Sequence, residues 1–356
     1  MGRKSCEAKA VNRVMRRYGL SCCIVAVCLM AADGADVAAP EGQAAARPEM
    51  DFTDRDYGGA FAKDPDVVKF GGRYLLYYST RLADRRFAVG IAESRDLVAW
   101  TKVGEVRPDA RYDRRGLAAP AALVHEGRVH LFYQTYGQGR LDAICHAVSE
   151  DGVRFERNPT NPIFRPMGDW NAGRAIDAEV FLDGETALLY CATRDPDMKR
   201  QMLVVATAPT AAGFVRESWT QRCDAAILAP ELPWETACVE APAVLKRDGR
   251  FYMFYAGGYN NNPQQIGVAV SDDGLSWKRV SDQPLLPNGL PESWNHSESG
   301  HPGVFTDDDG AQYLFFQGND DNGATWYLSK MRLRWRDGLP YLVRPGDGHE
   351  FHLSLP

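Results

Sequence analysis

The sequence predicts an all-β fold, a five-bladed β-propeller with four antiparallel strands in each blade. An apolar strand, a Gly-containing turn and a second strand rich in aromatic residues recur five times, in copies that start at Asp64, Ala119, Asp177, Ala241 and His301. These starts are 55, 58, 64 and 60 residues apart, and each copy continues with a third strand, a polar turn and a fourth strand. Almost no helical periodicity interrupts the pattern, so we expect one catalytic domain over residues 51–356.

The N-terminal 32 residues have the pattern of a secretory signal peptide. Residues 1–19 carry six basic groups and one acidic group, and an apolar run of 13 residues follows from Leu20 to Ala32. A transmembrane helix needs about 20 apolar residues, so this run is too short to span a bilayer. A buried N-terminal helix is the alternative. We expect residues 1–32 to be removed and the protein to be exported to the periplasm or the extracellular space, without integral membrane contact afterwards.

Residues 33–50 are rich in Ala and Pro and predict a linker between the signal peptide and the propeller. Without residues 1–32, 35 basic and 46 acidic groups remain, so the formal net charge is −11. Because an acidic surface repels phosphate backbones, nucleic acid is not expected as the partner.

The cysteines predict no zinc site. Four of the eight belong to the signal peptide, and the other four have no C-x-x-C spacing: Cys145, Cys191, Cys223 and Cys238. An oxidising compartment allows Cys223 and Cys238 to pair, but the spacing does not fix the connectivity.

The turns and apolar runs suit propeller blades. Gly71-Gly72 and Asp248-Gly249 favour hairpins, because their tight turns need positive φ angles. Each blade packs against neighbours on both faces, so apolar runs such as 74–78 and 251–255 need not alternate with polar residues. A β-sandwich is the alternative, but it requires no period of about 60 residues.

The first residues of the copies are candidates for a central pocket. The innermost strands of a propeller run along its axis, so equivalent positions form rings. Asp64, Asp177 and His301 start three copies, and Glu240 stands one residue before the fourth start. Like charges crowded at an axis oppose folding, so a shared position for three acids indicates function.

Cleavage of a glycosidic bond is the chemistry that suits such a cluster. One carboxylic acid donates a proton to the leaving oxygen, and an ionised carboxylate acts on the opposite side of the sugar. A third carboxylate can raise the pKa of the acid and orient it. The distance between the proton-donating acid and the ionised carboxylate decides between inversion and retention, and the sequence does not give that distance.

The five segments resemble the five-bladed propeller glycosidases of glycoside hydrolase family 43, the arabinofuranosidase, xylosidase and arabinanase group, to which families 32, 117 and 130 are related. The resemblance covers nearly all of residues 55–345. The matching motifs, in chain order, are Asp64-Pro65-Asp66, Ala119-Pro120, Ile176-Asp177 with Val180-Phe181, Glu240-Ala241-Pro242 and Gly300-His301.

The resemblance implies an inverting glycosidase that acts on plant or algal oligo- and polysaccharides. It implies Asp64 as the general base that activates water, Glu240 as the general acid and Asp177 as the modulator of the acid's pKa. It also implies that His301 lies beneath the site, in contact with substrate or with a structural calcium ion at the axis. No cofactor is required, and an imidazole is not a typical calcium ligand.

Aromatic and polar groups between the blades are candidates for sugar contacts, because aromatic rings stack on the apolar faces of sugars. Trp170 and Trp294 lie just before the third and fifth copies, and Arg81 and Asn260 are polar loop residues. The other tryptophans in strands are expected to pack the blades: Trp100, Trp219, Trp277 and Trp335 in fourth strands and Trp326 in a third strand.

Two departures from the family pattern stand out. Ala118 precedes Ala119-Pro120 where an aromatic residue is frequent, and Ala178-Glu179 follows Asp177 where Pro is usual, which adds a carboxylate.

Three alternatives remain: a propeller that binds glycans without cutting them, a retaining fructosidase similar to family 32, and a phosphorylase similar to family 130, which needs a basic phosphate clamp. Arg194-Asp195-Pro196 is similar to a fructosidase signature, but it follows a second strand, so we interpret Asp195 as a turn residue. The sugar, the linkage and exo or endo action are not predicted.

Overall fold

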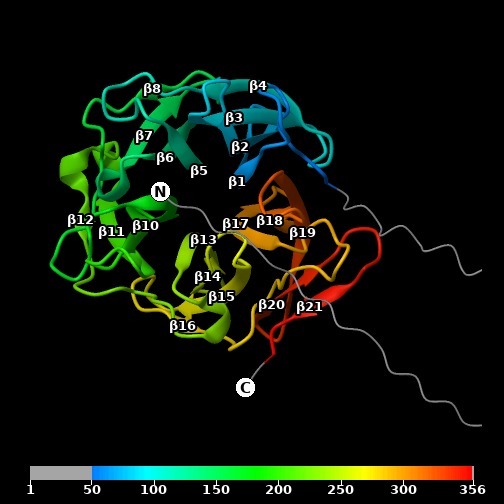
Figure 1. The fold of residues 1–356 in the computed structure, drawn as a ribbon. Coiled ribbons are helices and arrows are strands. Elements are labelled where there is room, and N and C mark those ends of the chain that lie inside the picture. The colour runs from blue at the N-terminus through cyan, green and yellow to red at the C-terminus, as the bar shows by residue number, and fades with distance from the viewer. Residues whose placement is uncertain (1–49, 355–356) are drawn as a thin grey trace, which may run out of the picture. The chain divides into compact units, whose positions relative to one another are not determined.

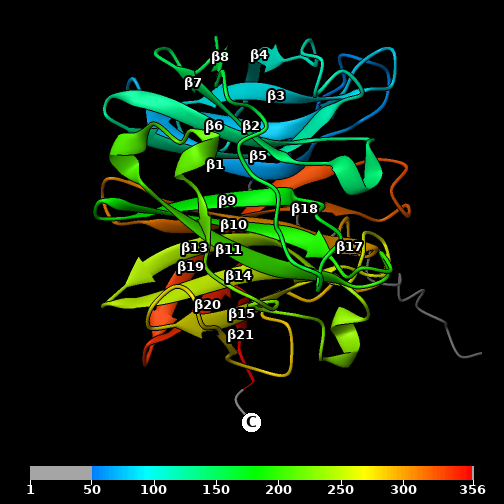
Figure 2. The ribbon, with the colours of Figure 1, turned by 90° about the vertical axis from the view of Figure 1, so that its left-hand side faces the viewer.

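The computed structural model describes residues 50–354, and five antiparallel sheets surround a common centre (Figure 1). The prediction of a five-bladed β-propeller is confirmed. In the side view of Figure 2 the sheets of blades 1 and 2 lie above those of blades 4 and 5. The predicted signal peptide and residues 33–49 of the predicted linker lie outside the described residues. No helix within residues 50–354 is long and apolar enough to cross a bilayer.

Successive strands of each blade run from the axis outward and pair with their sequence neighbours. Blade 1 holds β1 (Lys63–Phe70), β2 (Arg73–Arg81), β3 (Phe87–Ser94) and β4 (Thr101–Val106), and blade 2 holds β5 (Leu117–His125), β6 (Arg128–Thr135), β7 (Ile144–Ser149) and β8 (Glu156–Arg157). Blade 3 holds β9 (Ile176–Asp183), β10 (Thr186–Arg194), β11 (Gln201–Pro209) and β12 (Thr220–Gln221), and blade 4 holds β13 (Val239–Arg247), β14 (Arg250–Gly257), β15 (Gln265–Ser271) and β16 (Lys278–Arg279). Blade 5 holds β17 (Glu298–Thr306), β18 (Gln312–Asn319), β19 (Tyr327–Arg336), β20 (Leu339–Val343) and β21 (Glu350–His352). The short 3₁₀ helices of the described residues are Gly139–Leu141, Thr210–Ala212, Arg216–Ser218 and Pro233–Glu235.

Blade 5 differs from the prediction in two ways. It has five strands, because β21 pairs with β20 at the outer edge. The segment expected to supply a third and a fourth strand is the single strand β19, so Trp335 belongs to a third strand and not to a fourth. No turn-forming residue interrupts this segment before Asp337-Gly338, which is where the chain reverses into β20.

The segment before blade 1 closes the ring. Phe52 exchanges two backbone hydrogen bonds with Leu328 of β19, at 3.0 and 2.8 Å. Equivalent bridges join the connections between other blades to third strands, in the pairs Phe164 with Ile144, Leu228 with Leu203 and Leu286 with Ile266. Met50 is fully buried in the same hydrophobic cluster as Phe52.

We expect Phe52→Ala to lower the free energy of unfolding by about 3 kcal/mol, in the range for a buried Phe replaced by Ala. Phe52 is 9% exposed and packs edge-on against Tyr78, with ring centroids 5.0 Å apart, so the truncation opens a cavity at the closure. Urea unfolding measures the loss, with Tyr341→Ala on the outer strand β20 as the control. A loss below about 1 kcal/mol would show that closure at Phe52 contributes little to stability.

The four cysteines of the described residues are free thiols. Cys223 and Cys238, for which the sequence allowed a disulfide, are therefore not paired. Cys223 lies beside β11, with its sulfur 3.8 Å from the carbonyl oxygen of Val205. Cys238 is fully buried one residue before β13.

Candidate active site

Each inner strand carries a residue in the left-handed region at the same point of the repeat. The φ angles are 56° at Asp64, 46° at Ala119, 52° at Asp177, 50° at Ala241 and 46° at His301. The pairing register of each inner strand shifts at this point, as in a β-bulge. Left-handed non-glycine residues are uncommon and cluster at functional sites. Five such residues in equivalent positions therefore mark the end of the propeller axis at which the inner strands begin.

The bulges are held by the preceding blade. The backbone N–H of Asp64 donates to Gln317 Oε1 at 3.0 Å, and that of Asp177 donates to Gln134 Oε1 at 2.6 Å. Gln317 and Gln134 lie on second strands, β18 and β6. Blade packing thus fixes the backbone from which two of the acids project.

Asp64, Asp177 and Glu240 line one cavity of about 280 Å³. The three residues come from the inner strands of blades 1, 3 and 4, and each is less than a tenth exposed. His301 and Asn260 line the same cavity. The structure therefore brings together five of the predicted site residues.

Asp64 is paired with His301. The Nδ1 atom of His301 lies 3.0 Å from Asp64 Oδ1. Burial acts to raise the pKa of Asp64, but His301, Lys63, the Ser79 hydroxyl and the Ala119 amide outweigh it and hold that pKa below its usual value. Burial lowers the pKa of His301 itself, against the opposing effect of the Asp64 and Glu240 charges, and its Nδ1 lies within hydrogen-bond distance of the Asp64 carboxylate. Asp64 is therefore an ionised carboxylate with a fixed orientation.

Asp177 is the opposite case. Burial raises its pKa well above the usual value, and the neighbouring negative charges of Glu240 and Asp64 raise it further. Arg174 and Lys63 offset part of this rise. Because three carboxylates cannot all ionise at low cost in one buried cavity, the cluster retains a proton.

Glu240 is held by two side-chain amides. Gln264 Nε2 donates to Glu240 Oε1 at 2.6 Å, and Gln201 Nε2 donates to Glu240 Oε2. The residue stands one position before the left-handed Ala241 and is 8% exposed. Its carboxyl group therefore has a defined orientation at the cavity wall.

We expect Asp177→Asn to stabilise the fold at neutral pH. An acid whose pKa is raised by folding costs stability once the pH rises above the pKa it has in the unfolded chain. The Asn side chain removes that charge, so urea unfolding at pH 7.5 should give a higher free energy of unfolding for the variant than for the wild type. The gain should shrink towards pH 4, where an unfolded carboxyl is also largely protonated. A variant less stable than the wild type at pH 7.5 would contradict the raised pKa.

The cavity has lining residues that the sequence did not single out as site residues: Lys63, Phe87, Gln134, Tyr136, Arg194, Gln201 and Tyr259. Arg194 Nε and Arg174 Nη1 both donate to Gln201 Oε1, at 2.9 and 3.3 Å, and Gln201 in turn contacts Glu240. Tyr136, just after β6, and Arg194, the last residue of β10, stand at equivalent positions of blades 2 and 3. A search of the repeat at this second position would have found these two.

The other predicted contacts lie as follows. Asn260 accepts from Lys63 Nζ at 2.6 Å and lines the cavity. The guanidinium of Arg81 lies 4.3 Å from the ring centre of Phe61 and 5.5 Å from that of Phe87, a lining residue, but Arg81 does not itself line the cavity.

Trp170 and Trp294 do not line this cavity. Trp170 packs against the hydrophobic cluster between blades 2 and 3, and Trp294 lines a second cavity at blade 5. Both belong to a repeated pair, an aromatic residue followed by a buried polar residue six positions before the left-handed residue. The pairs are Tyr112-Asp113, Trp170-Asn171, Trp234-Glu235 and Trp294-Asn295. This repeat explains why tryptophans recur between the blades.

Asp195 is a turn residue, as its place after β10 indicated. Its Oδ1 accepts from the backbone N–H groups of Lys199 and Arg200, at 2.6 and 3.0 Å.

The donor set at the axis does not fit calcium. His301 offers a nitrogen already paired with Asp64, whereas calcium takes six to eight oxygen ligands. Within residues 50–354 no group of three or more His, Cys, Asp or Glu side chains is arranged to hold a metal ion. No step below is routed through a metal.

Comparisons with known proteins agree with this architecture. The chain matches the model of glycosyl hydrolases family 43 over residues 59–340. It is 24% identical over 329 residues to a xylosidase/arabinosidase of Butyrivibrio fibrisolvens, covering 83% of this chain and 58% of that protein. It is 34% identical over 88 residues to xylosidase/arabinosidase 43A of Humicola insolens, covering 25% of this chain and 24% of that protein. The chain thus spans about a quarter to three-fifths of the length of these curated relatives.

A solved structure supports the same fold. A thermostable family-43 glycoside hydrolase superposes with a TM-score of 0.64 at 22% identity, covering 82% of this chain and 95% of that one. The family model spans well over half of the chain, including all three acids of the cavity. By this match the chain belongs to the glycosyl hydrolases of family 43.

Proposed function

We propose that this chain is an exported glycoside hydrolase that cleaves plant or algal oligo- and polysaccharides with inversion of the anomeric carbon. The observation that carries the proposal is the cavity in which Asp64, Asp177 and Glu240 meet. The acids differ in environment, because the pKa of Asp64 is held below its usual value whereas the pKa of Asp177 is raised well above it. Carboxyl groups whose pKa values are pushed apart are the arrangement that acid–base cleavage requires.

The proposed mechanism assigns one role to each acid. Asp64, oriented by His301, takes a proton from a water molecule that attacks the anomeric carbon. Glu240, oriented by Gln201 and Gln264, donates a proton to the leaving oxygen. Asp177 and Glu240 repel each other as anions, so the pair holds the proton that leaves through Glu240.

The substrate proposal rests on the relatives. Two of them are named xylosidase/arabinosidase, so pentosides of xylose or arabinofuranose are the first candidates. Export is supported by the composition of residues 1–32. An oligo- or polysaccharide is then the partner, met outside the cytoplasm.

A panel of 4-nitrophenyl arabinofuranosides, xylosides and galactosides, together with natural oligosaccharides, tests the proposal. We expect turnover of at least one pentoside by the wild type. Tight binding without turnover across the panel would favour a propeller that only binds glycans.

A phosphorylase is the second candidate, because Arg174 and Arg194 line the cavity beside Gln201. Guanidinium groups are the side chains best suited to hold a phosphate. Addition of inorganic phosphate to the same panel separates the two reactions. A hydrolase releases the free sugar at a rate that phosphate does not increase, whereas a phosphorylase releases the sugar 1-phosphate.

A further inference from the structure

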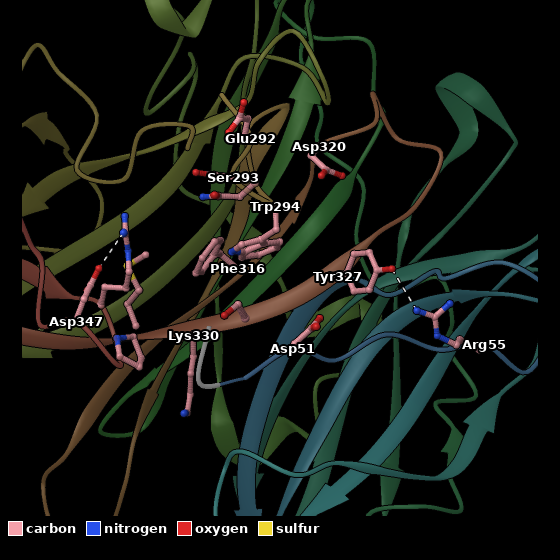
Figure 3. Close-up of a pocket in the computed structure, with 15 residues that line it drawn as sticks. Asp51, Arg55, Glu292, Ser293, Trp294, Phe316, Asp320, Tyr327, Lys330 and Asp347 are labelled. Carbon is pink, nitrogen blue, oxygen red and sulfur yellow. Dashed lines mark hydrogen bonds and ion pairs between the residues drawn. The ribbon is translucent and has the colours of Figure 1, made fainter. Parts of the chain in front are cut away.

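A second cavity, of about 830 Å³, lies at blade 5 (Figure 3). Its walls come from the connection before β17, from β19, from the N-terminal segment and from the turn between β20 and β21. Trp294 lies beside Phe316, with ring centroids 5.6 Å apart, and Tyr327 of β19 also lines the cavity (Figure 3). Three aromatic side chains therefore line a space of the size that small-molecule sites have.

The cavity exists because blade 5 lacks a buried polar network that fills blade 4. In blade 4, Tyr255 donates its hydroxyl to Glu235 Oε1 at 2.7 Å, and Arg279 Nε donates to the same oxygen at 2.7 Å. The strand pairing places Phe316 of blade 5 at the position of Tyr255, and Asn295 stands where blade 4 has Glu235.

Neither replacement continues the network. Phe316 has no hydroxyl, and Asn295 turns its amide to Ser299 Oγ at 2.8 Å. The strand β20 also pairs only with the second half of β19, from Arg332 onward, and leaves the first half beside the cavity. The sequence of blade 5 thus builds the cavity.

Polar groups at the rim are available to a ligand. Asp51, Glu292 and Asp320 are exposed, and none of them forms an ion pair or a side-chain hydrogen bond with another residue in the part of the chain that the structure describes. Arg55 Nη2 donates to the Tyr327 hydroxyl at 3.2 Å. Basic groups also line the cavity, at Arg55, Lys330 and Arg344, so charges of both signs surround it.

We propose that this cavity is a second, non-catalytic site that binds a neutral oligosaccharide. A sugar presents apolar C–H faces to aromatic rings and hydroxyl groups to carboxylates, and the lining offers both. Both cavities lie at the same end of the strands. The second cavity is lined from the connection before β17 and the loop after β18, and the catalytic cavity is lined by His301 near the start of β17 and by Asn260 in the loop after β14. A polysaccharide chain held here stays near the end of the propeller where the acids lie.

Calorimetric titration of the Glu240→Gln protein with xylotetraose, and separately with 1,5-α-arabinotetraose, tests this site. The Glu240→Gln change suppresses cleavage during the titration. We expect two binding events for at least one of these sugars. Adding Asp320→Ala or Tyr327→Ala should weaken one event at least tenfold, and adding Tyr341→Ala, an aromatic residue outside both cavities, should leave both events unchanged.

Two further readouts make the test decisive. Asp320→Ala alone should leave the kcat and KM of the wild type for a small aryl glycoside unchanged, because Asp320 does not line the catalytic cavity. Two events that both persist in the Asp320→Ala and Tyr327→Ala proteins, or a single event insensitive to them, would overturn the second site. The inference and the proposed function share only the assumption that the ligand is a glycan. If the protein bound a sugar in a way that depends on Asp320 but cleaved no substrate, the second site would stand and the hydrolase would be refuted.

Discussion

The Glu240→Gln variant should lose about 10²–10⁴-fold of kcat on substrates with poor leaving groups, the range that a general acid contributes. Glutamine has nearly the shape of glutamate, but it has no proton to give to the departing oxygen. An aryl glycoside with an acidic phenol needs less protonation, so its loss should be smaller. Measurement of kcat across aryl glycosides of rising phenol pKa checks this expectation. A plot of log kcat against the phenol pKa should fall more steeply for the variant than for the wild type.

Glu231→Gln is the matched control for this experiment. Glu231 is exposed, lies outside both cavities and pairs with Arg279 at 3.1 Å. Its replacement should leave kcat within about twofold, because surface changes of this kind are small. If Glu240→Gln cleaved natural oligosaccharides as fast as the control, Glu240 would not be the acid.

The Asp64→Asn variant should also lose about 10²–10⁴-fold of kcat, on good and poor leaving groups alike. Asparagine cannot accept a proton from the attacking water, and this step is needed whatever the leaving group. Added azide should restore part of the rate and yield a glycosyl azide of inverted configuration, because azide attacks without a base. Rates with and without azide, together with the configuration of the azide product, provide the measurement.

Asp66→Asn is the control on the same strand. Asp66 stands two residues beyond Asp64 and accepts backbone N–H groups of Val67 at 2.9 Å and Ala122 at 2.5 Å. It does not line the catalytic cavity, so its replacement should affect stability more than kcat. A larger loss of kcat in Asp66→Asn than in Asp64→Asn, at equal folded fraction, would remove Asp64 from the role of base.

The repeat made the architecture and the meeting of the acids readable from the sequence. A period of about 60 residues with a Gly turn in each copy fixes where every inner strand starts, and equivalent starts must lie around one axis. Asp64, Asp177 and Glu240 could therefore be chosen without any knowledge of the loops. Blade 5 departed from the predicted strand order because the segment expected to form its third and fourth strands is the single strand β19.

Other parts of the site carry no signal that a single sequence reveals. The left-handed bulges occur at Asp, Ala and His residues and not at glycines, so composition does not indicate them. Trp294 lies outside the cavity of the three acids, and its place between blades holds an aromatic residue in four connections, so an aromatic residue there does not by itself indicate the catalytic cavity. Lys63 and Tyr259 line the cavity without belonging to a recurring pattern that we identified in the sequence.

The stereochemistry of the first product tests most directly whether water attacks with Asp64 as its base. Proton NMR during the first minutes of hydrolysis, before mutarotation, resolves the two anomers of the released sugar. The proposed roles of Asp64 as base and Glu240 as acid predict an anomer inverted relative to the substrate. Release of the retained anomer would contradict it, because retention requires a covalent intermediate on a carboxylate and would make Asp64 a nucleophile.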